Sequence, residues 1–150
     1  MSYSTILAEL KTLLDAVTGI GTTFDYLPLL HDEQTLKSTF VSSGKLHAWI
    51  ITRVNASGTN QTIAHTLRNH VFDIYGYYAL DDANTSEKTF QQLCDTVMNK
   101  FDEQENIDLV ASVYVIAPSQ LLSFDPVMFC DVLCHRSIIR ITAEEELVRG

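Results

Sequence analysis

The sequence is poor in the residues that mark several classes of protein. It has only three cysteines in 150 residues, Cys94, Cys130 and Cys134, an odd number and too few for a disulfide-rich secreted scaffold. Its longest apolar runs, such as Val113–Ala117, fall far short of the roughly 20 residues of a membrane-spanning helix. The beginning, MSYSTILAELK, has no basic segment and includes Glu9, so we expect no signal peptide. These absences predict a protein made in the cytoplasm, with reduced, buried cysteines and no membrane contact.

Basic residues are scarce as well. Ten Lys and Arg stand against 19 Asp and Glu, which gives a net charge of −9. Affinity for a phosphate backbone needs clustered Lys and Arg, so we expect no specific binding of nucleic acid. An acidic surface still allows DNA to pass nearby without adhering. The simpler interpretation is that the excess charge keeps the protein soluble.

Two stretches have the apolar spacing of amphipathic helices. The first is predicted from about Ser4 to Val17, and Gly19 stands where a helix normally ends. The second is predicted from about Thr85 to Phe101, with Asn84 and Glu87 spaced as a capping box. The apolar residues that define the two stripes are Ile6, Leu7, Leu10, Leu13, Leu14 and Val17, and then Phe90, Leu93, Cys94, Val97 and Phe101.

Alternating stretches predict the strands. Two long strands, at about 46–54 and 70–80, flank the polar stretch Asn55–Asn69 and suggest a long antiparallel hairpin with a protruding tip. Further strands are predicted at 109–116 and 129–143, and a short edge strand at 24–27 ends at Pro28. Residues 19–45 are the hardest to assign. A helical turn is predicted within 32–40. The pattern predicts one α+β domain over 1–150, with a mostly antiparallel, mixed sheet, two main helices on one face and a long hairpin extension.

No catalytic motif is present: the sequence has no GxSxG, HExxH, Walker loop or GxGxxG. The pair Gly19 and Gly21 follows a helix instead of opening one, which suits a helix end. Cys130 and Cys134 would lie roughly 13 Å apart on a strand, with His135 on the other face, too far for one zinc ion. We therefore expect no catalytic residues, no cofactor and no metal site.

Apolar side chains are more numerous than one core requires, and this points to self-association. The predicted strands place Trp49, Ile51, Val71, Tyr75 and Tyr77 on the face opposite the helices, and Trp and Tyr are enriched at interfaces. A predicted loop, 118–128, is also rich in apolar residues. Alternatively, another segment such as 24–40 covers both. The candidate interface residues are Trp49, Ile51, Tyr75, Tyr77, Leu121, Leu122 and Phe124.

The chain resembles the tail terminator (tail-completion) proteins of long-tailed bacteriophages. The resemblance covers the order of elements along nearly the whole chain, residues 19–45 excepted. It is clearest in Arg68–Phe101, RNHVFDIYGYYALDDANTSEKTFQQLCDTVMNKF, where a strand with alternating aromatics, an acidic break and an amphipathic helix follow one another. The final strand, CDVLCHRSIIRITAEEE, is similar too.

The resemblance implies a structural virion protein without enzymatic activity. Such proteins form a ring, usually of six copies, on the head-proximal end of the tail tube. The ring stops tube polymerisation and offers its other side to the neck proteins, while DNA passes through its bore without specific binding. The implied partners are further copies of the chain, the tail tube protein and a neck or head-completion protein. Two alternatives remain open: a head-completion or adaptor protein that binds the portal, and a small α+β ligand-binding domain or enzyme.

Overall fold

The fold is known from a computed structural model, which describes residues 3–26, 41–42, 45–60, 63–81, 85–103, 108–110, 113–129 and 132–148. Within these described residues, two helices and seven strands follow one another. They are α1 (Tyr3–Asp15), β1 (Thr22–Phe24), β2 (Val41–Ser42), β3 (Lys45–Asn60), β4 (His65–Ala79), α3 (Ser86–Asp102), β5 (Asp108–Val110), β6 (Val113–Phe129) and β7 (Val132–Val148).

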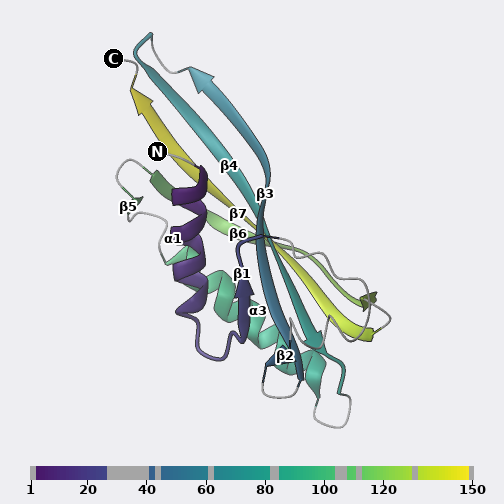
Figure 1. Ribbon diagram of the computed structural model, residues 1–150. Helices are drawn as coiled ribbons and strands as arrows, with labels where there is room; N and C mark the ends of the chain where they lie inside the picture. The colour runs from purple at the N-terminus through teal and green to yellow at the C-terminus, as the bar shows by residue number, and fades with distance from the viewer. Residues whose placement is uncertain are drawn as a thin grey trace.

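The strands form one mixed sheet in the order β1-β3-β4-β7-β6-β5, and β2 pairs with the beginning of β3. β1 runs parallel to β3, and the other neighbours in the sheet are antiparallel. Four long strands, β3, β4, β7 and β6, make up most of the sheet, as Figure 1 shows. The α+β class with a mostly antiparallel, mixed sheet is therefore confirmed.

Both helices pack on the same face of this twisted sheet and share one hydrophobic core with it. On α1, Tyr3 stacks on Phe72 of β4, with ring centroids 6.4 Å apart. On α3, Phe90 stacks on Tyr78 of the same strand at 5.2 Å. The fully buried side chains of this core include Ile6, Leu10, Leu14, Trp49, Ile51, Phe72, Ile74, Phe90, Cys94, Val97, Phe101 and Ile139. The two apolar stripes in the sequence are thus the buried sides of α1 and α3.

The helix bounds lie close to those predicted, but the start of α3 differs in detail. Thr85 occupies the N-cap with positive φ (51°), and its side chain makes no capping hydrogen bond. Asn84, the expected capping residue, lies outside the described residues. Instead, the Ser86 hydroxyl accepts a hydrogen bond of 2.8 Å from the Asp81 N–H and bonds to His135 at 2.9 Å.

Four strands are longer than predicted. β3 continues to Asn60 and β4 begins at His65, so most of the predicted loop 55–69 is strand. β6 runs through the predicted loop 118–128, and β7 extends to Val148. Polar strands carry no hydrophobic alternation, so the sequence pattern does not indicate them, and they form through backbone pairing with neighbouring strands. The predicted edge strand at 24–27 lies at Thr22–Phe24, and the helical turn predicted within 32–40 lies outside the described residues.

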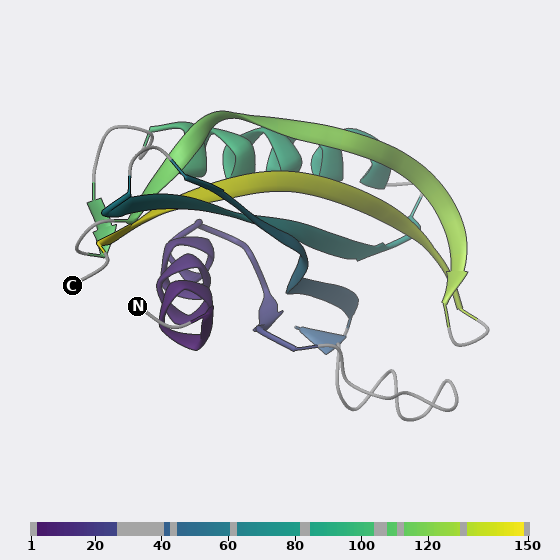
Figure 2. The same cartoon turned by 90° about the horizontal axis from the view of Figure 1, so that it is seen from above.

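The extra strand length projects beyond the helices. We call this projection the arm; it comprises Val54–Asn60 of β3, His65–Val71 of β4 and Thr142–Leu147 of β7, which pair with one another in register. Figure 1 shows the arm running past α1 to a narrow end. Seen from above in Figure 2, β6 and β7 bend strongly along their length. The long hairpin extension predicted from the sequence is the β3–β4 part of this arm.

Candidate assembly surfaces

Trp49 and Ile51, two of the predicted interface residues, lie in the core instead. Both are fully buried on the helix-covered face. The Trp49 ring lies 5.4 Å from that of Phe90, and its Nε1 donates a 3.0 Å hydrogen bond to Nε2 of His47. The prediction that they lie opposite the helices is wrong. β3 is apolar on both faces, so its sequence does not indicate which face the helices cover.

Tyr75 and Tyr77 do lie on the face opposite the helices. A second, smaller cluster on that face contains Ala48, Ile50, Tyr77 and Cys134, with Phe24, Tyr75, Ala79 and Val127 packed against it. Tyr77 is 8% exposed and Tyr75 is half-buried. Next to them, Arg140 donates two hydrogen bonds, of 2.9 and 3.2 Å, to the buried Asp73 carboxylate, and these raise the pKa of Arg140. This face therefore carries a small apolar cluster with the Arg140–Asp73 ion pair beside it.

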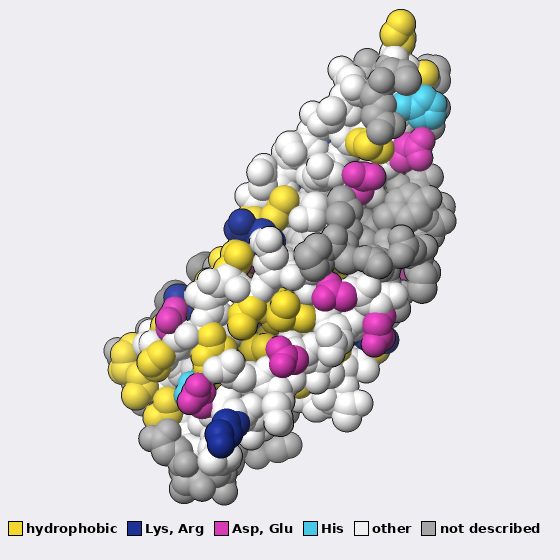
Figure 3. Space-filling view, turned by 180° about the vertical axis from the view of Figure 1, so that it is seen from behind, with side chains coloured by type: hydrophobic (Ala, Val, Ile, Leu, Met, Phe, Trp, Pro, Cys, Tyr) yellow, Lys and Arg dark blue, Asp and Glu magenta, His cyan; other side chains and the backbone are white. Residues whose placement is uncertain are grey.

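The remaining predicted interface residues lie on β6. Phe124 turns inward, with its ring 5.5 Å from that of Phe90. Leu121 and Leu122 are 38% and 44% exposed, and farther along the same pair of strands Met128 and its partner Leu133 are exposed at 64% and 48%. Figure 3 shows apolar side chains gathered toward the end of the molecule at which β6 and β7 meet. Exposed apolar side chains in a group are typical of a contact surface.

The outer edge of β6 also has free length. Among the described residues, β5 pairs with β6 at Val113 and Tyr114 only. From Gln120 to Met128, which we call the β6 edge, none of the described strands pairs with the side of β6 away from β7. A register shift between Leu121 and Ser123 leaves Leu122 without a partner in β7.

A second open edge lies on the other side of the sheet, along β3. β1 pairs with β3 only as far as Ile50. Beyond it, the side chains of Val54–Thr59 are all exposed, and none of the strands described here pairs with their outer side. We call Val54–Thr59 the arm edge. It contains no Lys and no Pro, the residues with which proteins usually protect an exposed strand edge.

A chain of polar contacts, buried at His70 and Glu145, lies at the base of the arm. His70 and Glu145 are 2% and 1% exposed, and Nε2 of His70 lies 3.1 Å from the Glu145 carboxylate. Nη1 of Arg53 lies 3.4 Å from Nδ1 of His70. The Arg53 guanidinium also lies over the Tyr3 ring, with Cζ 4.4 Å from the ring centroid. These contacts join β3, β4, β7 and α1 at the base of the arm.

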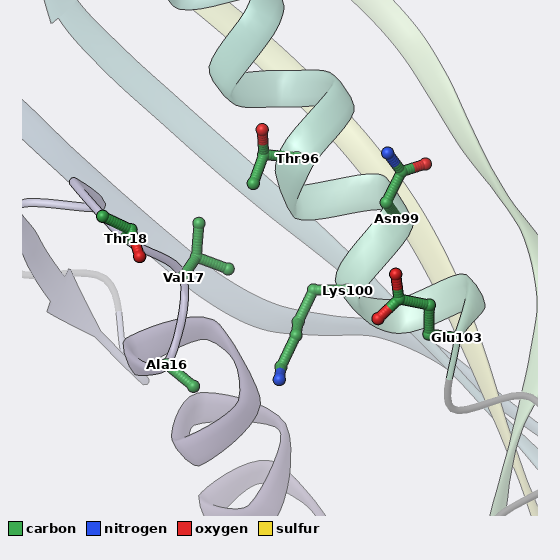
Figure 4. A pocket seen from close by; sticks show the side chains of 7 residues that line it. All are labelled: Ala16, Val17, Thr18, Thr96, Asn99, Lys100 and Glu103. Atoms are coloured by element: carbon green, nitrogen blue, oxygen red, sulfur yellow. The ribbon is translucent and has the colours of Figure 1, made fainter.

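A shallow groove of about 290 Å³ lies between the end of α1 and α3. Figure 4 shows its lining, Ala16, Val17, Thr18, Thr96, Asn99, Lys100 and Glu103. The Lys100 side chain points toward α1. An adjoining hollow of about 330 Å³ includes His47, and burial lowers the pKa of this histidine to about 4. In neither hollow do the described side chains form the hydrogen-bonded acid, base and nucleophile of a catalytic site.

The cysteines behave as apolar residues. Cys94 and Cys134 are buried free thiols, and burial raises the pKa of each to about 11. Cys130 lies outside the described residues. Cys134 belongs to the smaller cluster, whereas His135 is on the other face beside Phe90 and Phe124. Within the described part of the chain, no three His, Cys, Asp or Glu residues are grouped to hold a metal ion.

Comparisons with known proteins leave the family open. The described residues include no helix with the length and hydropathy needed to cross a bilayer. The sequence matches no model of a protein family and no curated protein.

Proposed function

We propose that this protein is a structural subunit that forms a ring, and that the ring acts as the tail terminator of a long-tailed bacteriophage. The observation that supports this most is the pair of open strand edges on opposite sides of one sheet, the arm edge and the β6 edge. The two edges are chemically different, so each copy has two different contact surfaces. The resemblance of Arg68–Phe101 and the final strand to tail terminators supplies the biological role.

A ring follows from such surfaces by symmetry. A contact between two different patches is heterologous, and it generates a ring when the rotation between neighbours closes. The exposed apolar residues on β6, Leu121, Leu122 and Met128, would be buried by such a contact. Burial of apolar area contributes roughly 25 cal/mol per Å² to the free energy of association.

The acidic charge is compatible with this role. Six copies, the number that the resemblance implies, would carry −54 (6 × −9). A bore with negative potential repels the DNA backbone and lets it pass without adhering.

The proposed partners are the tail tube protein on one side of the ring and a neck or head-completion protein on the other. The tip of the arm suits contact with an adjoining ring, because Ile63 there is 94% exposed. A side chain of this kind gains free energy when another protein covers it.

The experiment is size-exclusion chromatography with light scattering, on the protein alone and mixed with its tail tube protein. The proposal predicts a closed oligomer in at least the mixture, bound to tube ends. A portal preparation serves as the comparison, since preferential binding to the portal instead of the tube would identify a head-completion adaptor. A monomer in every mixture would contradict the proposed ring.

A further inference from the structure

We propose that the arm edge of one copy pairs with the β6 edge of the next, so that the sheets of neighbouring subunits join into one continuous sheet. This inference rests on the proposed ring and names the surfaces that close it. The occupant of the arm edge is therefore a second copy of this chain.

Strand direction favours this pairing. The strands β3, β4, β7 and β6 are successive antiparallel neighbours, so β3 and β6 run in opposite directions. When a second copy is placed beside the first by a rotation about a ring axis, its β3 runs antiparallel to the first copy's β6. Antiparallel pairing is the more stable arrangement per residue.

The two edges also lie at different levels of the sheet. In the arm edge, Asn55 to Thr59 pair with Val71 to Leu67 of β4. Those β4 residues pair in turn with Thr142 to Glu146 of β7. Gln120 to Asp125 of the β6 edge pair with Arg140 to Arg136 of the same strand. The edges are thus offset by about six residues, or roughly 20 Å at about 3.3 Å per residue. A sheet that closes on itself requires such a stagger between its first and last strands.

Side-chain sizes are complementary. The arm edge carries small side chains at Ala56, Ser57 and Gly58. The β6 edge carries exposed large ones at Leu121 and Leu122. Large and small residues that face each other across neighbouring strands interdigitate and bury apolar area without steric overlap.

Proline limits how far the strands pair. Pro126 lacks a backbone N–H and cannot donate to a neighbouring strand. The paired segment is therefore Gln120–Asp125, which matches the length of Val54–Thr59. A symmetric pairing of two arm edges is the competing arrangement, and it would give closed dimers with exposed β6 edges.

Disulfide trapping tests the pairing directly. In a Cys130→Ser background, one cysteine is placed on the arm edge (Asn55→Cys, Ser57→Cys or Thr59→Cys) and one at Ser123→Cys. These positions lie on the same face of the sheet by the register of β3, β4, β7 and β6. Within one chain they are separated by β4 and β7, about 14 Å or more, which is beyond the reach of a disulfide. Every cross-link therefore joins two copies.

The proposal predicts that at least one double variant, oxidised under assembly conditions with tube protein, gives a ladder of oligomers ending in a closed ring. The two single variants mixed together should give dimers only, and each single variant alone should stay uncross-linked. Efficient dimers from an arm-edge variant alone would overturn the proposal in favour of symmetric pairing. Rings seen by light scattering without cross-links in any pair would overturn the edge pairing and leave the proposed function intact, whereas the absence of any oligomer would overturn both.

A charge on the edge gives an independent test. Ser57→Lys places on the arm edge the residue that commonly blocks strand addition, and Gln91→Lys is the matched control on the exposed side of α3. Ring formation should fall at least tenfold in Ser57→Lys and stay unchanged in Gln91→Lys, with equal melting temperatures. Normal ring formation by Ser57→Lys would contradict the pairing.

Discussion

Gly76 of β4 lies directly opposite Trp49 of β3, and its missing side chain leaves the space that the Trp49 ring occupies. A Cβ atom at Gly76 would lie 2.6 Å from Cζ3 of Trp49 and 2.8 Å from Oγ of Ser137. The indole is fully buried against α3 and cannot move away without disturbing the core. The contact with Gly76 therefore indicates that Trp49 serves to pack the core.

Gly76→Ala should therefore destabilise the protein by about 1–3 kcal/mol, as overpacking of a core usually does. The measurement is the free energy of unfolding by urea denaturation. Gly58→Ala is the control, because the nearest atom to its added Cβ would be Thr66 Cγ2 at an ordinary 3.6 Å. Equal stability of the two variants would contradict the described packing.

Trp49→Ala should lower the free energy of unfolding by about 3–5 kcal/mol, because it removes a large buried aromatic side chain and leaves a cavity. Trp49→Phe keeps a ring in the same space and should cost less. If Trp49→Ala instead kept full stability and lost only assembly, Trp49 would be an interface residue after all.

Leu122→Ser should weaken assembly and leave folding almost unchanged, because Leu122 has no partner in β7 and is 44% exposed. Leu80→Ser, at the end of β4, alters a similarly exposed leucine away from both open edges. Light scattering over a concentration series measures the first effect, and thermal unfolding the second. A lower melting temperature without a change in assembly would remove Leu122 from the interface.

His47 should make stability depend on pH. Its folded pKa of about 4 lies below the ordinary 6.5 because burial disfavours the charged ring. Only the unfolded chain binds this proton between those values, so stability falls as the pH drops from 6.5 to 4 and then levels off. Because the His47 ring is partly exposed, we expect the free energy of unfolding to fall by about 2 kcal/mol over this pH range.

His47→Gln keeps an acceptor for Nε1 of Trp49 and removes the titration. Its free energy of unfolding, measured from pH 7.5 to 4, should fall less steeply than that of the unaltered protein. Parallel curves for the two proteins would show that His47 does not carry this dependence.

The helices and the core could be predicted from the sequence because their signal is apolar spacing. Each helix carries its apolar residues on one side, and that side is buried in the main core. These residues run from Ile6 to Leu14 in α1 and from Phe90 to Phe101 in α3. The arm could not be predicted, because residues such as Asn55, Ser57 and Asn69 have no alternation and are strands only through backbone pairing.

The faces of the sheet were ambiguous for a related reason. β3 carries Ala48 and Ile50 on one face and Trp49 and Ile51 on the other, and all four are fully buried. Only packing against α1 and α3 decides which face belongs to the main core. The exposure of Leu121 and Leu122 could be anticipated, although their segment was predicted to be a loop.

The most direct test of the proposed function is the mass of the complex that the protein forms with its tail tube protein, determined by light scattering after size exclusion. A ring subunit predicts one discrete species that contains several copies of this chain on a tube end, and tubes that no longer elongate. A monomer at every concentration, with tubes that lengthen as if it were absent, would contradict the account.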